Sequence, residues 1–128
     1  MPKWDDYKST AQERGALALE LYVAESTPNP DGPPLPYVLP DHLAYQRDQE
    51  AAGNLASAQP VSDLSGEEME GAGLIIYRAQ SLEEARILAE SDPMHETGAR
   101  RFTLRRWLIN EGSLQLSVGL STKHVGMG

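Results

Sequence analysis

The side chain best suited to proton chemistry in this sequence is the imidazole of His42. It follows Pro40 and Asp41 where we expect a helix to begin, and Gly53 is expected to end that helix. Proline fits the first helical position because its φ is fixed and it lacks an N–H group, and Asp41 places negative charge at the positive end of the helix dipole. The same dipole favours a neutral imidazole, in which one nitrogen can accept a proton. His42 is therefore a candidate general base, and the alternative is a surface histidine without a role.

Arg105 and Trp107 are the next candidates, because both lie on one face of the strand that we expect over Phe102–Asn110. A guanidinium can donate hydrogen bonds to a developing enolate or phenolate, and an indole offers a flat apolar face to a ring. We therefore consider both as substrate-binding residues. The alternative is that they make packing and dimer contacts.

The sequence predicts neither a metal site nor a cofactor site. His95 and Glu96 are adjacent and lack the i, i+4 spacing that makes a helical metal motif specific. The carboxylates of residues 62–71 are explained by the solvation of a polar loop. His124 lies in the tail, where we expect it to be inert.

The composition narrows the classes of partner. The chain has 128 residues, with 19 acidic and 11 basic side chains, and its net charge is -8. A phosphate backbone would repel such a chain, so nucleic acid is not an expected partner. No apolar run approaches the roughly 20 residues of a membrane helix, and there is no cysteine for disulfides or thiolate chemistry. We therefore expect a cytoplasmic protein with no membrane partner and a single core.

Hydrophobic periodicity predicts the elements that position these side chains. Apolar patterns predict strands at Ala16–Glu25, Leu55–Val61, Ala72–Ala79, Phe102–Asn110 and Leu114–Leu120. The second strand is expected at a sheet edge because it ends in Pro60, and the third at the centre because it is apolar on both faces. A second core helix is expected after Ser81, which forms a capping-box pattern with Glu84, and Ser91-Asp92-Pro93 ends it.

The remaining segments are expected outside the core. Residues 1–15 suggest a short helix that docks through Trp4 and Tyr7. The prolines of Thr27–Leu39 exclude a helix interior and a central strand, so we expect a long surface loop there. Such a loop is either a lid over the site or a tolerated insertion. Residues 121–128 are expected to form a mobile tail.

The order strand, helix, strand, strand, helix, strand is that of a ferredoxin-like α+β fold, in which both helices cover one face of an antiparallel sheet. We expect one domain, with an N-terminal extension at 1–15, a core at 16–110, and a C-terminal strand and tail at 111–128. The other sheet face would carry Arg105 and Trp107, which are too bulky to leave in water. A second copy of the chain, making a homodimer, or an enclosed ligand is expected to cover it.

Two segments resemble the YciI-like (YCII-related) family. LPDHLAYQRDQEAAGNLASAQP is similar to the family signature, in which a histidine begins the first helix and a glycine-containing turn leads into a strand. ESDPMHETG is similar to the Asp-Pro stretch after the second helix. The resemblance covers residues 16–110 and implies a dimeric α+β barrel with His42 and Asp92 as its active-site residues. Two positions depart from the family pattern and bear on pocket shape, since Gln59 replaces a glycine and Met94 an aromatic residue.

The resemblance also implies a class of reaction. One branch of the family dehydrochlorinates a chlorinated hydroxyhydroquinone, and barrels of the same build include muconolactone isomerases. A small lyase or isomerase is therefore implied, acting by acid-base chemistry on a small cyclic compound that carries oxygen or chlorine. His42 would take a proton, and a carboxylate such as Asp92 would orient the imidazole or stabilise its charged form. The alternative is a dimeric module that binds a small molecule without turnover.

The expected fold sets a condition on this pair. If the two helices lie alongside each other, the start of one and the end of the other are about 18 Å apart for helices of about 12 residues. His42 and Asp92 would then have to meet across the dimer, or the loop after Asp92 would have to fold back. If neither occurs, Asp92 only shapes the turn before Pro93, which is a common role for Asp before proline.

Overall fold

Ten helices and strands make up the chain, and the computed structural model describes residues 1–128. In chain order they are α1 (Trp4–Glu13), β1 (Leu19–Pro28), α2 (Leu35–Ala52), β2 (Leu55–Pro60), β3 (Gly73–Tyr77), α3 (Leu82–Glu90), α4 (Pro93–Glu96), β4 (Arg100–Ile109), β5 (Leu116–Val118) and β6 (Val125–Met127). They form two compact units, a larger one at Glu20–Trp107 and a smaller one made of Met1–Leu19 and Leu108–Gly128. None of the helices combines the length and apolar character that crossing a membrane requires.

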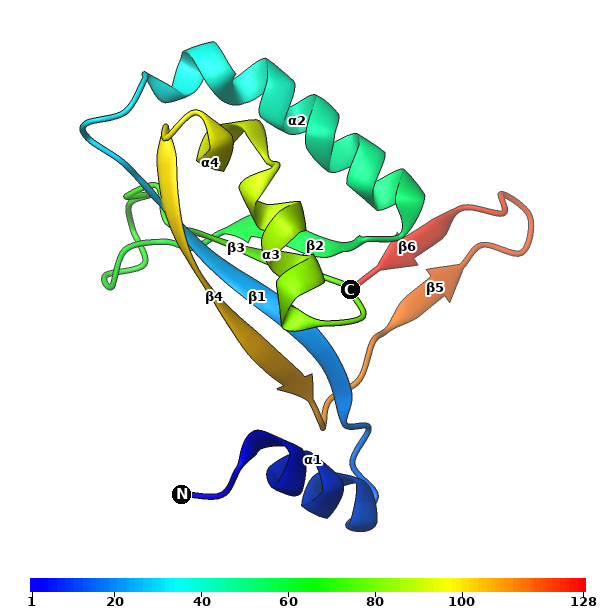
Figure 1. Ribbon diagram of the computed structural model, residues 1–128. Helices are drawn as coiled ribbons and strands as arrows, with labels where there is room; N and C mark the ends of the chain where they lie inside the picture. Colours follow the sequence, from blue (N-terminus) through cyan, green and yellow to red (C-terminus); the bar gives the residue numbers. More distant parts are fainter. The chain divides into compact units, whose positions relative to one another are not determined.

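The larger unit contains a four-stranded sheet in the order β2-β3-β1-β4, with α2 and α3 on one face (Figure 1). β3 is antiparallel to both β1 and β2. A hydrogen bond of 2.9 Å from the Asn29 amide to the Ala99 carbonyl joins the end of β1 to the start of β4, so this pair is antiparallel as well. The order confirms the predicted ferredoxin-like βαββαβ fold, with β2 at an edge and β3 inside the sheet.

The main core of this unit lies between the sheet and α3. Inward side chains of β1 and β3 meet two alanines of the helix, whose small size lets helix and sheet approach closely. These buried residues are Tyr22, Ala24, Ile75, Tyr77, Ala85 and Ala89. The predicted cap of α3 is confirmed, because the Ser81 hydroxyl accepts a hydrogen bond of 3.1 Å from the Glu84 amide.

Helix α2 begins at Leu35, and the prediction that it begins at Pro40 was wrong. Pro36 lies in the first turn, where no N–H is needed, and Pro40 lies inside the helix. The missing N–H of Pro40 leaves the Pro36 carbonyl without its helical partner, but Pro36 is exposed and water can replace that partner. Val38 is buried in a small cluster with Met94. This packing outweighs the local preference against helix, as tertiary contacts often do.

The first strand and the loop after it also differ from their predictions. β1 begins at Leu19, because Gly15 and Ala18 have positive φ values of 88° and 50° that interrupt an extended chain. The strand then continues to Pro28. The long surface loop predicted over Thr27–Leu39 was therefore wrong, since strand and helix occupy both of its ends.

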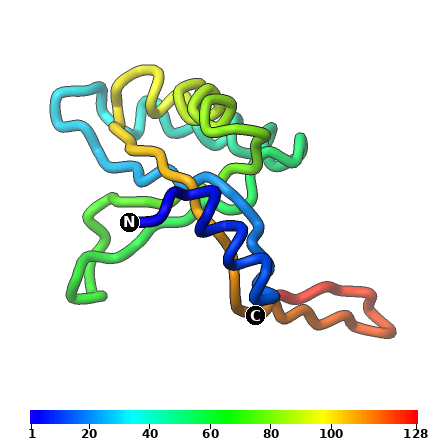
Figure 2. The backbone as a smooth tube through the Cα atoms, turned by 60° about the horizontal axis from the view of Figure 1, so that its bottom comes forward, coloured from blue at the N-terminus to red at the C-terminus, as the bar shows by residue number.

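The smaller unit contains α1 and a C-terminal hairpin. α1 ends just before Gly15, as the sequence predicted. β5 and β6 pair antiparallel with Leu116 opposite Met127, and Figure 2 shows them as the orange and red end of the tube. The prediction of a mobile tail was wrong, because β6 belongs to this hairpin. Lys123 adopts a positive φ of 61° in the turn, a conformation for which the sequence carries no glycine signal.

Candidate active site

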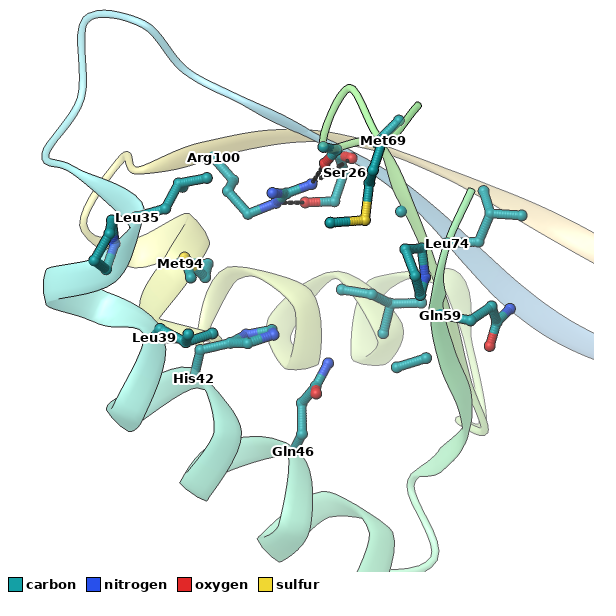
Figure 3. Close-up of a pocket in the computed structure, with 17 residues that line it drawn as sticks. Ser26, Leu35, Leu39, His42, Gln46, Gln59, Met69, Leu74, Met94 and Arg100 are labelled. Atoms are coloured by element: carbon teal, nitrogen blue, oxygen red, sulfur yellow. Dashed lines mark hydrogen bonds between the residues drawn. The ribbon is translucent and has the colours of Figure 1, made fainter. Parts of the chain in front are cut away.

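The imidazole of His42 lies at the wall of a cavity, where α2 places it. His42 is about two turns beyond the start of α2 at Leu35, so its N–H belongs to the interior of the helix. The predicted position in a first turn with free N–H groups was therefore wrong. The side chain is 14% exposed, and Figure 3 shows it directed from α2 toward the pocket.

Asp92 is the buried partner of His42. Its carboxylate oxygens lie 2.8 and 2.9 Å from His42 Nδ1, and its side chain is 1% exposed. Asp92 is also the N-cap of α4, where Oδ1 accepts a hydrogen bond of 2.9 Å from the Met94 amide. Asp92 therefore has two roles, because it caps α4 and also contacts the imidazole of His42.

The two residues meet within one protomer because α2 and α3 run in opposite directions. β1 and β2 are both antiparallel to β3, so the helix between β1 and β2 runs opposite to the helix that follows β3. The first turns of α2 thus lie beside the end of α3, and the expected separation of about 18 Å was wrong. Asp92, directly after α3, then reaches His42 without a partner subunit.

The geometry determines where the ring carries its hydrogen. An ionised carboxylate only accepts hydrogen bonds, so Nδ1 of a neutral His42 carries the hydrogen and donates it to Asp92. Nε2 keeps its lone pair and has no hydrogen-bond partner within the protein. A ring held in this way can accept a proton from a molecule in the cavity, and Asp92 stabilises the cation that results.

The cavity beside His42 has a volume of about 370 Å³, within the range of small-molecule sites. Its walls come from α2, β2, β3 and the segment before β3, with single residues from β1, α4 and β4 (Figure 3). Most of the lining is apolar. Polar side chains in the wall come from Ser26, His42, Gln46, Gln59 and Arg100. Gln46 is one turn after His42 on α2, so the two side chains project to the same side of the helix.

A second polar network surrounds Ser26. His95 Nδ1 lies 2.7 Å from the Ala89 carbonyl, so this nitrogen carries the hydrogen and donates it. Nε2 of His95 therefore accepts from the Ser26 hydroxyl at 2.8 Å, and Arg100 Nε donates to the same hydroxyl oxygen at 2.8 Å. Burial lowers the pKa of His95 and so favours the neutral ring, in which Nε2 accepts from Ser26.

Arg105 and Trp107 lie apart from the His42 cavity. With Val23, Glu25 and neighbouring side chains they line a separate hollow on the sheet face opposite the helices. Arg105 forms an ion pair with Glu25 in this hollow. The structure therefore does not bring these two candidates together with His42 in one protomer. His124 is exposed between β5 and β6.

Sequence reasoning missed Ser26, Gln46 and Arg100 as cavity residues. Ser26 and Arg100 are polar residues that continue the inward faces of β1 and β4, next to the apolar Ala24 and Phe102 on those faces. Polar groups at such positions need a partner, which makes them a detectable signal. Gln46 follows His42 at the i, i+4 spacing of a helix face, and this spacing was also available from the sequence.

The chain matches a protein family and a solved structure. The profile of the YCII-related domain matches residues 21–108. No curated protein matches the chain. A 5-chloro-2-hydroxyhydroquinone dehydrochlorinase from Burkholderia phenoliruptrix, in complex with 2,5-dihydroxybenzoquinone, is similar at 21% identity, with 68% of this chain and 92% of that chain covered and a TM-score of 0.50. At this identity the likeness shows a shared fold.

Proposed function

Because the chain belongs to the YCII-related family, we propose that it is a small enzyme of the lyase or isomerase type. His42 acts as general acid and base, and Asp92 orients and stabilises its imidazole. The observation that carries this proposal is the His42 ring, whose Nδ1 lies 2.8 Å from a buried carboxylate while the ring faces a cavity. The substrate is a small cyclic compound bearing oxygen or chlorine, a class that includes the compound named for the similar dehydrochlorinase.

In an elimination, His42 Nε2 removes a proton from a hydroxyl group or an acidic carbon of the substrate. The electron pair left behind forms a new π bond, and the carbon–chlorine bond breaks with its electron pair, so that chloride leaves. Asp92 stabilises the imidazolium through the hydrogen bond at Nδ1. The proton then passes from Nε2 to water, and the net loss is HCl. In an isomerisation, the same nitrogen returns the proton to a different carbon of the substrate.

Replacement of His42 by glutamine tests this proposal. Glutamine has a similar size and a polar end but cannot act as a base at neutral pH, so kcat is expected to fall by about 10²–10⁴. His124→Gln is the matched control, because His124 is exposed and lines no part of the cavity. Chlorinated and non-chlorinated hydroxyquinols and lactones serve as substrates, and chloride release and product formation are measured.

The possible outcomes separate two functions. Turnover by His42→Gln at the wild-type rate would show that His42 is not the base. Binding of these compounds without turnover, with only a modest change in affinity for His42→Gln, would indicate a non-catalytic binding module instead.

The proposal extends to a homodimer that forms through the sheet face opposite the helices. Trp107 is 41% exposed on this face, and the neighbouring charge of Arg105 is neutralised by Glu25. An exposed indole beside a paired arginine is typical of protein interfaces. Light scattering is expected to give twice the chain mass of 14.0 kDa, and Trp107→Glu is expected to give the mass of one chain. A wild-type protein that stays monomeric at high concentration would contradict this arrangement.

A further inference from the structure

The guanidinium of Arg100 is a cation in the cavity wall, and its hydrogen bonds go to neutral acceptors. Nε donates to the Ser26 hydroxyl and Nη2 to the Ser26 carbonyl, each at 2.8 Å (Figure 3). Nη2 also donates to the Gly71 carbonyl. These acceptors hold the group between β1, β4 and the segment before β3 without neutralising its charge.

No carboxylate lies within ion-pair distance of Arg100. The ion pairs of the larger unit involve other residues, and the nearby Asp92 is bound to His42. Arg100 does not lack an ion-pair partner because carboxylates are scarce, since the chain has 19 acidic residues against 11 basic ones. Burial lowers the pKa of Arg100, as expected for a cation that loses water without gaining a counter-ion, and the charge of Asp92 opposes this shift.

The outer part of the guanidinium remains available to a ligand. Nη1 has no hydrogen-bond partner within the protein. A rigid, partly desolvated and unpaired guanidinium is suited to the oxygen of a carboxylate, enolate or phenolate. His42 lies on the other side of the pocket, with apolar side chains such as Met94 and Leu39 in the wall (Figure 3). The cavity thus combines a fixed cation, an apolar wall and a proton acceptor.

We propose that the cavity binds a small flat molecule with a negatively charged oxygen, and that Arg100 holds this oxygen while the ring lies against the apolar wall. The inference rests on the proposed function of the site and specifies its substrate class as compounds with an ionised acid, enol or phenol group. A neutral compound of the same shape binds more weakly, because it leaves the guanidinium without an anionic partner.

The experiment compares 2,5-dihydroxybenzoquinone, which is ionised at neutral pH, with its neutral dimethyl ether. Calorimetry at neutral pH gives the dissociation constants of both compounds for the wild type and Arg100→Gln. The wild type is expected to bind the acid at least about tenfold more tightly than the ether, since hydrogen bonds to charged groups are the stronger ones. In Arg100→Gln the acid loses this preference while the affinity for the ether is unchanged.

Two further variants make the comparison specific. Arg101→Gln is the matched control, because Arg101 is the next residue along β4 but is 64% exposed and lines no part of the cavity. It is expected to keep the wild-type preference. Arg100→Lys keeps the charge without the planar fork and is expected to retain part of the preference. Thermal unfolding of each variant checks that the fold persists.

Equal affinity of the wild type for acid and ether would overturn the inference without any variant. A preference that survives in folded Arg100→Gln would also overturn it. Turnover that depends on His42 but shows no preference for the acid would leave the proposed chemistry standing and remove the role of Arg100. A preference that depends on Arg100, without turnover of any compound, would support the anion site and count against an enzyme.

Discussion

Replacement of Asp92 by asparagine is expected to reverse the tautomer of His42. Asparagine has nearly the same shape, and its oxygen can still accept the hydrogen bond from the Met94 amide. Its other end is an NH₂ donor that faces His42 Nδ1 in place of a carboxylate oxygen. The NH₂ group takes the place of Oδ2 and can donate only to an Nδ1 without hydrogen, whereas an Nδ1–H would have to share Oδ1 with the Met94 amide, so the ring that carries its hydrogen on Nε2 is favoured. No lone pair then faces the cavity, and kcat is expected to fall by about 10²–10⁴.

The effect of this substitution on stability is expected to be smaller than that of alanine. Asp92→Ala leaves the Met94 N–H and His42 Nδ1 without partners, and each lost partner of a buried group costs about 1–3 kcal/mol. The sum is a loss of about 2–6 kcal/mol in the free energy of unfolding. Asp92→Asn keeps both contacts after the tautomer change and is expected to lose about 1 kcal/mol. Urea unfolding of the two variants measures the difference.

Nitrogen-15 NMR of the imidazole measures the tautomer directly. The wild type is expected to carry the hydrogen of neutral His42 on Nδ1, and Asp92→Asn is expected to carry it on Nε2. Asp31→Asn is a matched control, because Asp31 is 86% exposed and its ion pair with Arg101 lies outside the cavity. A wild-type ring with its hydrogen on Nε2, or full activity in Asp92→Asn, would refute the assigned geometry.

Other substitutions test the surrounding structure. Burial lowers the folded-state pKa of His95, so below the unfolded value of about 6.5 the unfolded chain binds a proton that the folded chain does not. The free energy of unfolding is therefore expected to fall as the pH falls through this range, and a His95→Gln variant with the same pH dependence would contradict this. Ser81→Ala removes the hydrogen bond from the Glu84 amide and is expected to cost about 1 kcal/mol in thermal unfolding, whereas an unchanged melting temperature would count against the cap. The Tyr77 hydroxyl is buried without a partner, so Tyr77→Phe is expected to be as stable as the wild type or more stable by about 1 kcal/mol in urea unfolding. Tyr22→Phe loses a 2.7 Å hydrogen bond to Glu20 and is expected to be less stable than the wild type.

The fold was predictable where local signals agree with tertiary packing. The continuous apolar run Leu74–Tyr77 and the Ser81 cap both mark elements that the structure contains. The start of α2 was not predictable in this way, because Pro36 and Pro40 oppose a helix locally. Burial of Val38 stabilises that turn, and this contact comes from a segment more than fifty residues away in the chain.

The candidate site was predictable only in part, because the apolar alternation that identifies a strand ends next to the cavity residues Ser26 and Arg100. Apolar alternation ended the first predicted strand at Glu25, one residue before Ser26. The same criterion began the fourth core strand at Phe102, two residues after Arg100. A polar residue at an inward position interrupts the pattern by which strands are recognised. Ser26 and Arg100, which line the cavity, therefore fall just outside the strands that periodicity predicts.

The main core and the cavity lie at different positions along the strands β1 and β3. The register pair Tyr22↔Tyr77 lies in the main core, while Ser26↔Gly73, four residues further along β1, lies in the cavity wall. Four strand residues span about 13 Å. Ile75 lies between the two pairs, and it belongs to the main core and also lines the cavity. The alanines of α3 pack against the strands at the end that contains Tyr22 and Tyr77. The end that contains Ser26 has polar groups in the cavity wall. Substitutions such as Arg100→Gln are therefore expected to change binding more than folding, because the contacts that hold the main core do not include this side chain.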